Sequence, residues 1–200
     1  MSKTIGMLAA AGLLALAGAA PAAAETYTID ETHSSVNFAV RHLMVSKTRG
    51  TFGVFEGTFV HVPGEPEKWQ VSATMHVPSI DTRNEDRDAH LRSSDFFDAE
   101  KYPTMTFETT GVDMRSETEG TLRGNLTMRG VTRPVELDLE VLGLVTDPWG
   151  NRRAGFTASG TIDRRDWGLT WNTALETGGV LVGDEVEISL EIEGIATPSP

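Results

Sequence analysis

The stretch SIDTRNEDRDAHLRSSDFFDAEKYPTMTF, residues 79–107, decides the fold of this chain, because it is the long segment that lacks strand-like alternation. Its first part, residues 81–92, is charged and has no β-branched side chain after Thr82. This composition favours a short solvated helix or an ordered loop. Two adjacent phenylalanines, Phe96 and Phe97, follow. A charged crossover with an aromatic pair, set between two groups of strands, predicts the segment that closes a β-barrel.

The sequence on both sides of this crossover alternates between apolar and polar residues. The period of two is typical of half-buried strands that present one face to a core. It recurs in about eight or nine segments separated by turn residues at hairpin spacing, without a strand–helix–strand rhythm. Clear examples are residues 36–40, 71–77, 135–141 and 186–192. We therefore predict an antiparallel all-β fold, and a barrel in preference to a sandwich.

The first 24 residues have the organisation of a secretory signal peptide. Lys3 supplies the positive charge, residues 5–20 are almost entirely Ala, Leu, Gly and Met, and residues 22–24 match the small-residue cleavage pattern. The apolar run is short for a membrane span, so a retained anchor helix is the less favoured interpretation. We expect cleavage after Ala24 and a periplasmic mature protein.

The remaining chain is long enough for one domain, which we place at residues 25–196, followed by a flexible tail at residues 197–200. It contains no cysteine, so its stability comes from the core, and no cysteine-linked lipid anchor is available. The formal charge is −12, and loss of Lys3 with the leader makes it −13. Because phosphate backbones and anionic membranes repel such a protein, we predict no nucleic-acid partner and no stable membrane anchor.

Motifs for catalysis or metal binding are absent from the sequence. The five histidines show neither an H-E-x-x-H motif nor close paired spacing. No G-x-S-x-G or S-x-x-K nucleophile motif is present. The acidic run from Asp81 to Asp88 contains arginines, and fits ion pairs on a solvated helix better than paired catalytic carboxylates. We predict no catalytic residue, no metal and no cofactor.

Aromatic side chains gather where such a barrel would have its mouth. A closed barrel of about eight strands encloses enough space for one small or slender ligand. Phe96 and Phe97 lie in the crossover, and Trp167 and Trp171 lie in a late segment beside a glycine-containing loop at residues 178–183. This distribution favours an apolar binding site. The alternative is that the aromatic and methionine side chains simply fill the core.

Several longer motifs resemble one known family, the YceI-like family of exported polyisoprenoid-binding proteins with a lipocalin-like barrel. They cover nearly all of residues 27–196 in the family's order. Two are specific, the Leu-Thr-x-x-Gly-Val-Thr-x-Pro-Val hairpin and the Arg-Asp-x-His-Leu crossover. The matching pieces are YTIDETHSSVNF at 27–38 with His42, RGTF at 49–52, FEG at 55–57, SIDT at 79–82, RDAHL at 87–91, DFFD at 95–98, KYP at 101–103 with Phe107, GNLTMRGVTRPV at 124–135, RRDWG at 164–168 and VGDEV at 182–186.

The resemblance implies an eight-stranded antiparallel lipocalin-like barrel with a short helical crossover around residues 82–98. It further implies an apolar tunnel that holds a polyisoprenoid chain, such as a quinone or its precursor, in a periplasmic carrier that is a homodimer. Two alternatives stay open: an enzyme that acts on an apolar isoprenoid substrate, and a stress-related scaffold protein whose barrel is filled.

We expect inward-facing apolar and aromatic residues to line the tunnel. His42 is the candidate for a contact with a polar head group, and the alternative is a rim histidine bonded to backbone. Arg133, Arg165 and Asp166 are expected to pin turns. The predicted ligand-binding residues are Phe38, Val40, His42, Phe52, Phe55, Met75, Phe97, Met105, Phe107, Trp167 and Trp171.

Overall fold

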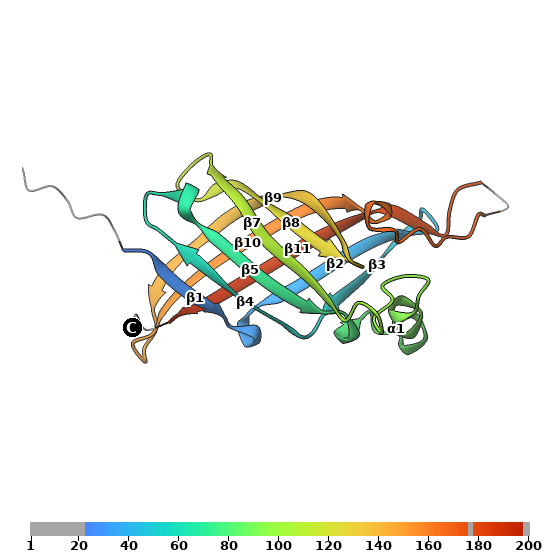
Figure 1. The fold of residues 1–200 in the computed structure, drawn as a ribbon, viewed down its shortest axis with the longest axis horizontal. Coiled ribbons are helices and arrows are strands. Elements are labelled where there is room, and N and C mark those ends of the chain that lie inside the picture. Colours follow the sequence, from blue (N-terminus) through green and yellow to red (C-terminus); the bar gives the residue numbers. More distant parts are fainter. Residues whose placement is uncertain (1–22, 176–177, 198–200) are drawn as a thin grey trace, which may run out of the picture.

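The protein folds as a ring of antiparallel strands closed on itself (Figure 1). The computed structural model describes residues 23–175 and 178–197. Its strands are β1 (Glu25–Ile29), β2 (Ser35–His42), β3 (Ser46–Phe52), β4 (Phe55–His61), β5 (Gln70–His76), β6 (Ile80–Asp81), β7 (Thr104–Met114), β8 (Glu119–Met128), β9 (Val131–Thr146), β10 (Arg152–Asp163) and β11 (Val182–Ala196). Most of the predicted leader and tail lies outside the described residues.

Eight strand positions make up the barrel wall. The ring runs β1, β4, β5, β7, β8, β9, β10 and β11, and β1 pairs with β11 to close it. This confirms the predicted all-β, eight-stranded antiparallel barrel. The crossover does not complete the ring, because β1 and β11 do so.

The other three strands extend the first part of the wall. β1 and β2 lie end to end along β11, separated by a 3-10 turn at Glu31–His33. In the same way β3 and β4 form one interrupted strand, since β3 pairs with β2 and β4 pairs with β1. On their other side β3 pairs with β6 and β4 pairs with β5, so β5 and β6 form another interrupted strand. Pro78 lies in the turn that separates β5 from β6, where a missing N–H removes no ladder bond.

The alternation predicted from the sequence appears as alternating burial along the strands. In β8, alternate residues from Gly120 to Met128 are buried, and in β9 Val135, Leu137 and Leu139 are buried between exposed neighbours. Successive side chains of a strand point to opposite faces, so every second residue faces the interior. The inward rows of all strands together form one apolar interior.

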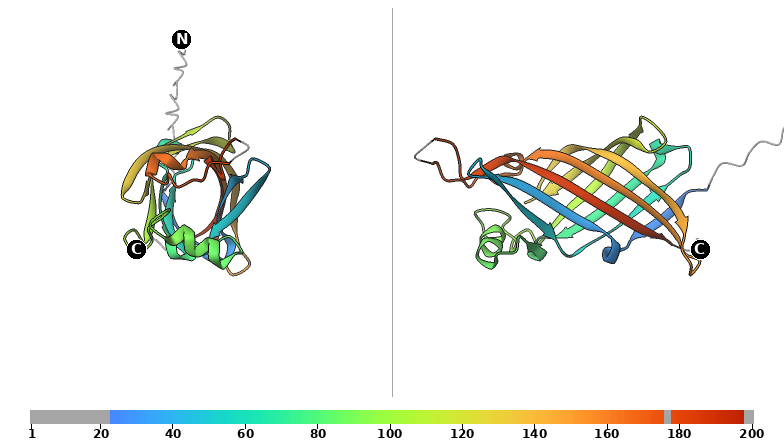
Figure 2. Two further views of the ribbon diagram at one scale, coloured as in Figure 1. Left: turned by 90° about the vertical axis from the view of Figure 1, so that its right-hand side faces the viewer. Right: turned by 180° about the vertical axis from the view of Figure 1, so that it is seen from behind.

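The crossover contains the one α-helix of the described residues, α1 (Glu85–Arg92), which lies at one end of the barrel (Figure 2, left). Asn84 begins the helix, since its side-chain oxygen accepts a hydrogen bond from the Arg87 N–H at 2.9 Å. Acidic residues in the first turn suit the positive end of the helix dipole. The short helical crossover predicted around residues 82–98 is therefore confirmed.

Both termini of the described chain lie at the opposite end of the barrel from α1 (Figure 1). We refer to these as the α1 end and the terminal end. Among the described residues, no helix is long and apolar enough to span a bilayer.

Candidate functional site: an apolar cavity inside the barrel

The interior of the barrel contains a large apolar cavity. Its volume is about 190 Å³. All of its lining residues are apolar except Asn37 and Arg164. The apolar lining comes from the inward rows of most strands and from the crossover: Ile29, Val36, Phe38, Val40, Phe52, Phe55, Val71, Ala73, Met75, Leu91, Phe96, Phe97, Met105, Phe107, Leu122, Leu126, Met128, Val135, Leu137, Phe156, Ile162, Leu169, Val182, Val186, Ile188, Leu190 and Ile192.

Two inward-facing glycines keep this cavity open. A Cβ atom on Gly50 would lie 2.4 Å from Cζ of Phe38, and one on Gly124 would lie 2.2 Å from Cζ of Phe107. Both distances are far below van der Waals contact, so only glycine lets these two rings lie against the wall. The rings therefore cover the wall without blocking the lumen.

Side chains on β2 and β11 remain half-exposed although they face inward. Val36, Phe38 and Val40 on β2, with Ile188 and Leu190 on β11, line the cavity and are only partly buried. Their exposed surface borders the cavity. Apolar groups beside such a void lack contact atoms on one side, and they regain those contacts when an apolar molecule fills the space. An apolar cavity of this kind favours an apolar occupant over water.

Aromatic rings close the cavity toward the terminal end. Tyr27 and Phe59 stack with their centroids 4.9 Å apart and their planes nearly parallel, and Phe156 meets Phe59 edge-on at 5.2 Å. Gly194 lies beneath the Phe59 ring, where a Cβ would come within 2.4 Å of it. Tyr27, Phe59 and Phe156 are all buried, and these rings separate the main cavity from a smaller second pocket that Phe59 and Phe156 also line.

The α1 end differs, because a helix held through polar contacts lies along the rim of the opening (Figure 2, left). The buried Asp88 carboxylate accepts hydrogen bonds from the backbone N–H and the hydroxyl of Thr82. Arg87 donates to the Thr82 hydroxyl and to the Thr82 carbonyl, both at 2.7 Å. This Thr82–Arg87–Asp88 network fixes the start of α1 beside β6.

Three rings dock the other end of the helix. His90 meets Phe96 and Trp171 edge-on, with centroids 5.0 and 4.8 Å away, and Phe96 and Trp171 are 5.2 Å apart. His90 Nε2 also lies 3.0 Å from a carboxylate oxygen of Asp95. On the cavity side, the Phe97 ring packs edge-on against Phe52 at 5.8 Å. The crossover thus contributes both a fastening and part of the cavity wall.

Arg164 is the one charged side chain, among the described residues, that lines the cavity. Its guanidinium donates to the carbonyls of Leu169, Trp171, Val182 and Gly183 and to the carboxylate of Asp184. Burial lowers the pKa of Arg164 from its usual value. All five guanidinium N–H groups have partners, so this side chain joins the segment after β10 to the start of β11.

Eight of the eleven residues predicted to bind a ligand line the cavity, namely Phe38, Val40, Phe52, Phe55, Met75, Phe97, Met105 and Phe107. The other three do not. Their contact with a ligand stays a prediction, as does that of the eight.

His42, Trp167 and Trp171 lie outside the lining for different reasons. His42 ends β2, beyond the last cavity residue of that strand. Trp167 is 2 % exposed, and its indole N–H donates to the Leu126 carbonyl at 3.0 Å, so it fastens the wall. Trp171 belongs to the ring cluster that docks α1.

The sequence reasoning missed Arg164 and the inward row of β11, and it placed Phe96 at the mouth without counting it among the ligand-binding residues. The alternation of Val186, Ile188, Leu190 and Ile192 was visible as a strand. Alternation identifies inward residues, however, and does not tell which of them border empty space.

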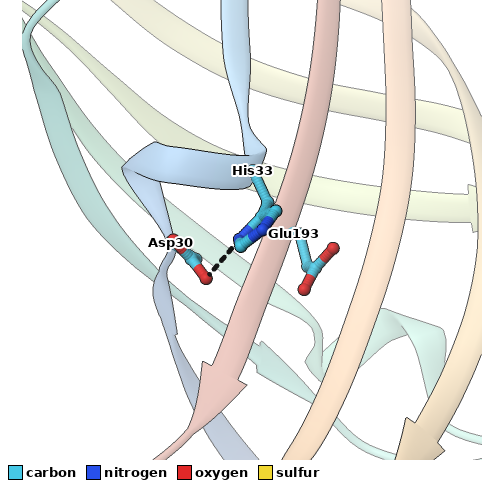
Figure 3. Close-up of side chains that lie close together, drawn as sticks. All are labelled: Asp30, His33 and Glu193. Atoms are coloured by element: carbon cyan, nitrogen blue, oxygen red, sulfur yellow. Dashed lines mark hydrogen bonds and ion pairs between the residues drawn. The ribbon is translucent and has the colours of Figure 1, made fainter. Parts of the chain in front are cut away.

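A second cluster of ionisable groups lies on the outside of the barrel at the interruption between β1 and β2 (Figure 3). The carboxylates of Asp30 and Glu193 and the His33 ring have ligand-type atoms within 4.8 Å of one another. Arg153 already binds both carboxylates, at 2.9 Å for Asp30, and Asp147 as well. A guanidinium among these oxygens makes the cluster an ion-pair network that fastens β1 to β10 and β11.

The fold and the cavity together define the class of protein: an up-and-down β-barrel with an interior that accommodates an apolar molecule. A family model described as the YceI-like domain matches residues 27–194. The chain therefore belongs to the YceI-like family, as its sequence motifs predicted.

Known relatives cover almost the whole chain. Protein YceI of Salmonella newport is 38% identical over 197 residues, which are 98% of both chains. The crystal structure of a YceI protein of Campylobacter jejuni has a TM-score of 0.69 and 30% identity, and covers 79% of this chain and 90% of that one. A polyisoprenoid binding domain from Saccharophagus degradans, implicated in plant cell wall breakdown, has a TM-score of 0.63 and 16% identity, and covers 86% and 98%. At 16% identity this likeness concerns the fold.

Proposed function

We propose that the protein is a periplasmic carrier that holds a polyisoprenoid chain, such as the tail of a quinone or its precursor, inside the barrel. The observation that carries this proposal is the cavity inside the barrel, whose lining is apolar except for Asn37 and Arg164. A polyprenyl tail gains roughly 25 cal/mol for each Å² that it removes from water. Because apolar contact has no preferred direction, such a lining accepts a chain without reading a sequence of polar groups.

The two ends of the barrel suggest how the chain lies. Tyr27, Phe59 and Phe156 pack the terminal end, so the tail points toward them. The polar head group then lies at the α1 end, where the crossover and its polar residues surround the opening. His42 ends β2 at this same end, beyond the lining, and its contact with the head group stays a prediction.

Binding explains this interior better than catalysis or a scaffold role. Arg164 is the one titratable group that lines the cavity within the described part of the chain, and all its N–H groups are engaged. General acid–base chemistry requires a titratable group within reach of the substrate. A filled barrel would also have no wall side chains left half-exposed to its own lumen. The family membership and the polyisoprenoid binding named for the Saccharophagus domain agree with the carrier role.

Filling the cavity tests the proposal. Ala73 lines it from β5, and the next residue, Thr74, faces outward on the same strand. We expect Ala73→Phe to fold with a melting temperature no lower than that of the wild type, and to lose retention of a polyprenyl quinone. Thr74→Phe is the matched control and should retain it. The readout is the quinone extracted after gel filtration of protein and quinone together.

Equal retention by the wild type and Ala73→Phe would contradict the proposed site. Retention by none of the three proteins would contradict the carrier role. The homodimer implied by the family resemblance is a separate proposal, which light scattering on the mature protein tests.

A further inference from the structure

The hairpin turn between β2 and β3 has an unfavourable backbone for its residues. Val45 N–H bonds to the His42 carbonyl at 3.1 Å, and the two residues between them, Leu43 and Met44, have φ angles of 51° and 62°. This is the conformation of a type I′ turn, in which Asn-Gly is preferred because both positions need positive φ. Large apolar side chains rarely occupy it. A strained turn of this kind points to a role other than stability.

The same three residues form an exposed apolar tip. Leu43 is 38%, Met44 is 58% and Val45 is 81% exposed. Turns normally carry polar residues. The positive φ angles and the exposed apolar side chains of this tip therefore both destabilise the folded hairpin in water.

Cations stand directly behind the apolar tip. Arg41 and Lys47 are paired across the ladder on the outer face of the hairpin, and Arg49 follows two residues along β3. Like charges directly opposite each other in a ladder are unfavourable. Residues 35–50 contain no Asp or Glu, although the whole chain carries a charge of −12. The neighbouring Glu187 of β11 binds Lys47, and Glu185 lies two residues earlier on the same exposed face of β11.

The hairpin lies at the α1 end, where the cavity opens. Val40, two residues before His42, lines the cavity, and so does Val182, the ladder partner of His42. The hairpin and α1 lie at the same end of the barrel (Figure 1). Cargo that leaves the cavity at this end emerges beside the tip.

We propose that the β2–β3 hairpin docks the open end of the barrel on an anionic lipid bilayer. Leu43, Met44 and Val45 enter the interfacial layer, and Arg41, Lys47 and Arg49 contact anionic head groups. Apolar residues flanked by cations are the pattern of interfacial membrane contact. This inference rests on the proposed function, because a lipid carrier must meet a membrane to load its cargo.

The occupant is a bilayer and not a protein partner. Three exposed side chains on one turn are far smaller than the roughly 800 Å² per partner of a stable protein interface. A bilayer needs no matching shape. The acidic remainder of the protein does not prevent the contact, since charges are screened beyond about 8 Å at physiological ionic strength. It does keep the contact short-lived, which suits a carrier.

Vesicle flotation tests the inference with the full mature protein. The wild type should float with vesicles of phosphatidylethanolamine and phosphatidylglycerol and not with phosphatidylcholine vesicles. Replacing Arg41 and Arg49 with Gln should weaken binding about 30-fold, at about 1 kcal/mol for each cation near the surface.

A second variant separates docking from folding. Leu43→Asn/Met44→Gly installs the residues that a type I′ turn prefers, so its melting temperature should rise while vesicle binding falls about tenfold or more. Val145→Ser/Trp149→Ser is the matched control, because these residues are 64% and 82% exposed but lie at the terminal end. That control should float like the wild type.

Flotation of Leu43→Asn/Met44→Gly at the wild-type level, or no flotation of the wild type, would overturn the inference. Binding of the wild type to vesicles made of phosphatidylcholine only would overturn the role of the cations. Quinone retention is measured on the same preparations. If the wild-type protein retains quinone but does not float, only the docking is contradicted. If the wild-type protein does not retain quinone, the carrier role itself is contradicted.

Discussion

The two ends of the barrel are built from the same strands but close in opposite ways. At the terminal end, Tyr27, Phe59 and Phe156 pack ring against ring. At the α1 end, wall residues such as Phe38 border a cavity, and a helix fastened by a few polar groups lies at the rim of the opening. Regular alternation thus produced stacked rings with a small pocket in one half and the main apolar cavity in the other.

The difference teaches where stability and function lie. Contacts at the terminal end involve only the packed wall, so we expect that end to unfold with the whole protein. The α1 end depends on local contacts and is expected to open at lower free energy, as binding sites and lids commonly do. Substitutions in the two ends and along the wall between them should therefore differ in size and in reach.

The largest effect is expected from removing a ring of the packed end. Phe59→Ala deletes a buried ring between Tyr27 and Phe156 and should lower the free energy of unfolding by about 3–5 kcal/mol. Phe38→Ala is the control. Because the Phe38 ring already borders the cavity, its removal should lower the free energy of unfolding by only about 1–2 kcal/mol. Denaturant unfolding of the two apo variants measures both. Equal losses would mean that the ends are packed alike.

The next effect concerns the buried charge at the α1 end. Arg164→Met leaves the carbonyls of Leu169, Trp171 and Gly183 without donors in a buried site and should cost about 3 kcal/mol. Arg165→Met is a suitable control, because Arg165 is exposed and its loss should cost about 1 kcal/mol or less. Similar stability of the two variants in thermal unfolding would contradict the role given to Arg164.

A smaller, local effect is expected from loosening α1. Asp88→Ala removes the acceptor for the Thr82 N–H and hydroxyl and should destabilise the start of the helix by about 1–2 kcal/mol. Hydrogen exchange should accelerate in α1 and not in β8 or β9, and a bound quinone should dissociate faster. Uniform acceleration over the barrel would show that α1 does not open separately.

The smallest effect is a dependence of stability on pH at the strand interruption. The hydrogen bond from His33, with that from Arg153, lowers the pKa of Asp30 from 3.8 to about 2. Because the folded state holds this carboxylate deprotonated more strongly than the unfolded state, its contribution is complete above about pH 4 and is lost as the pH falls through about 2. Between about pH 4 and pH 2, the melting temperature should fall less in Asp30→Asn than in the wild type. Parallel curves would contradict the assignment.

Much of the fold could be predicted from the sequence, because alternation and turn residues act locally. The period of two gave the strands, and the charged run of residues 81–92 gave the helix. The lining could be predicted only in part. Phe38 and Phe59 both lie over a glycine, Gly50 and Gly194, yet one borders the cavity and the other belongs to the packed end. Whether a ring borders the cavity depends on the residues that face it across the lumen. Those residues are distant in the sequence, so no local pattern predicts them.

The polar side chains show the same limit. Trp167 resembled a mouth residue by composition, but its indole N–H has its acceptor, the Leu126 carbonyl, in a distant strand. Arg164 faces an apolar cavity because its partners lie around residues 169–184. Such contacts are long-range, so a motif can mark these residues without revealing what they do.

Native mass spectrometry of the protein purified from cells without detergent, followed by solvent extraction, tests the central claim most directly. We predict a discrete added mass that is extracted as a polyprenyl compound. A mass equal to that of the bare chain, unchanged after incubation with long isoprenoids, would contradict the carrier role.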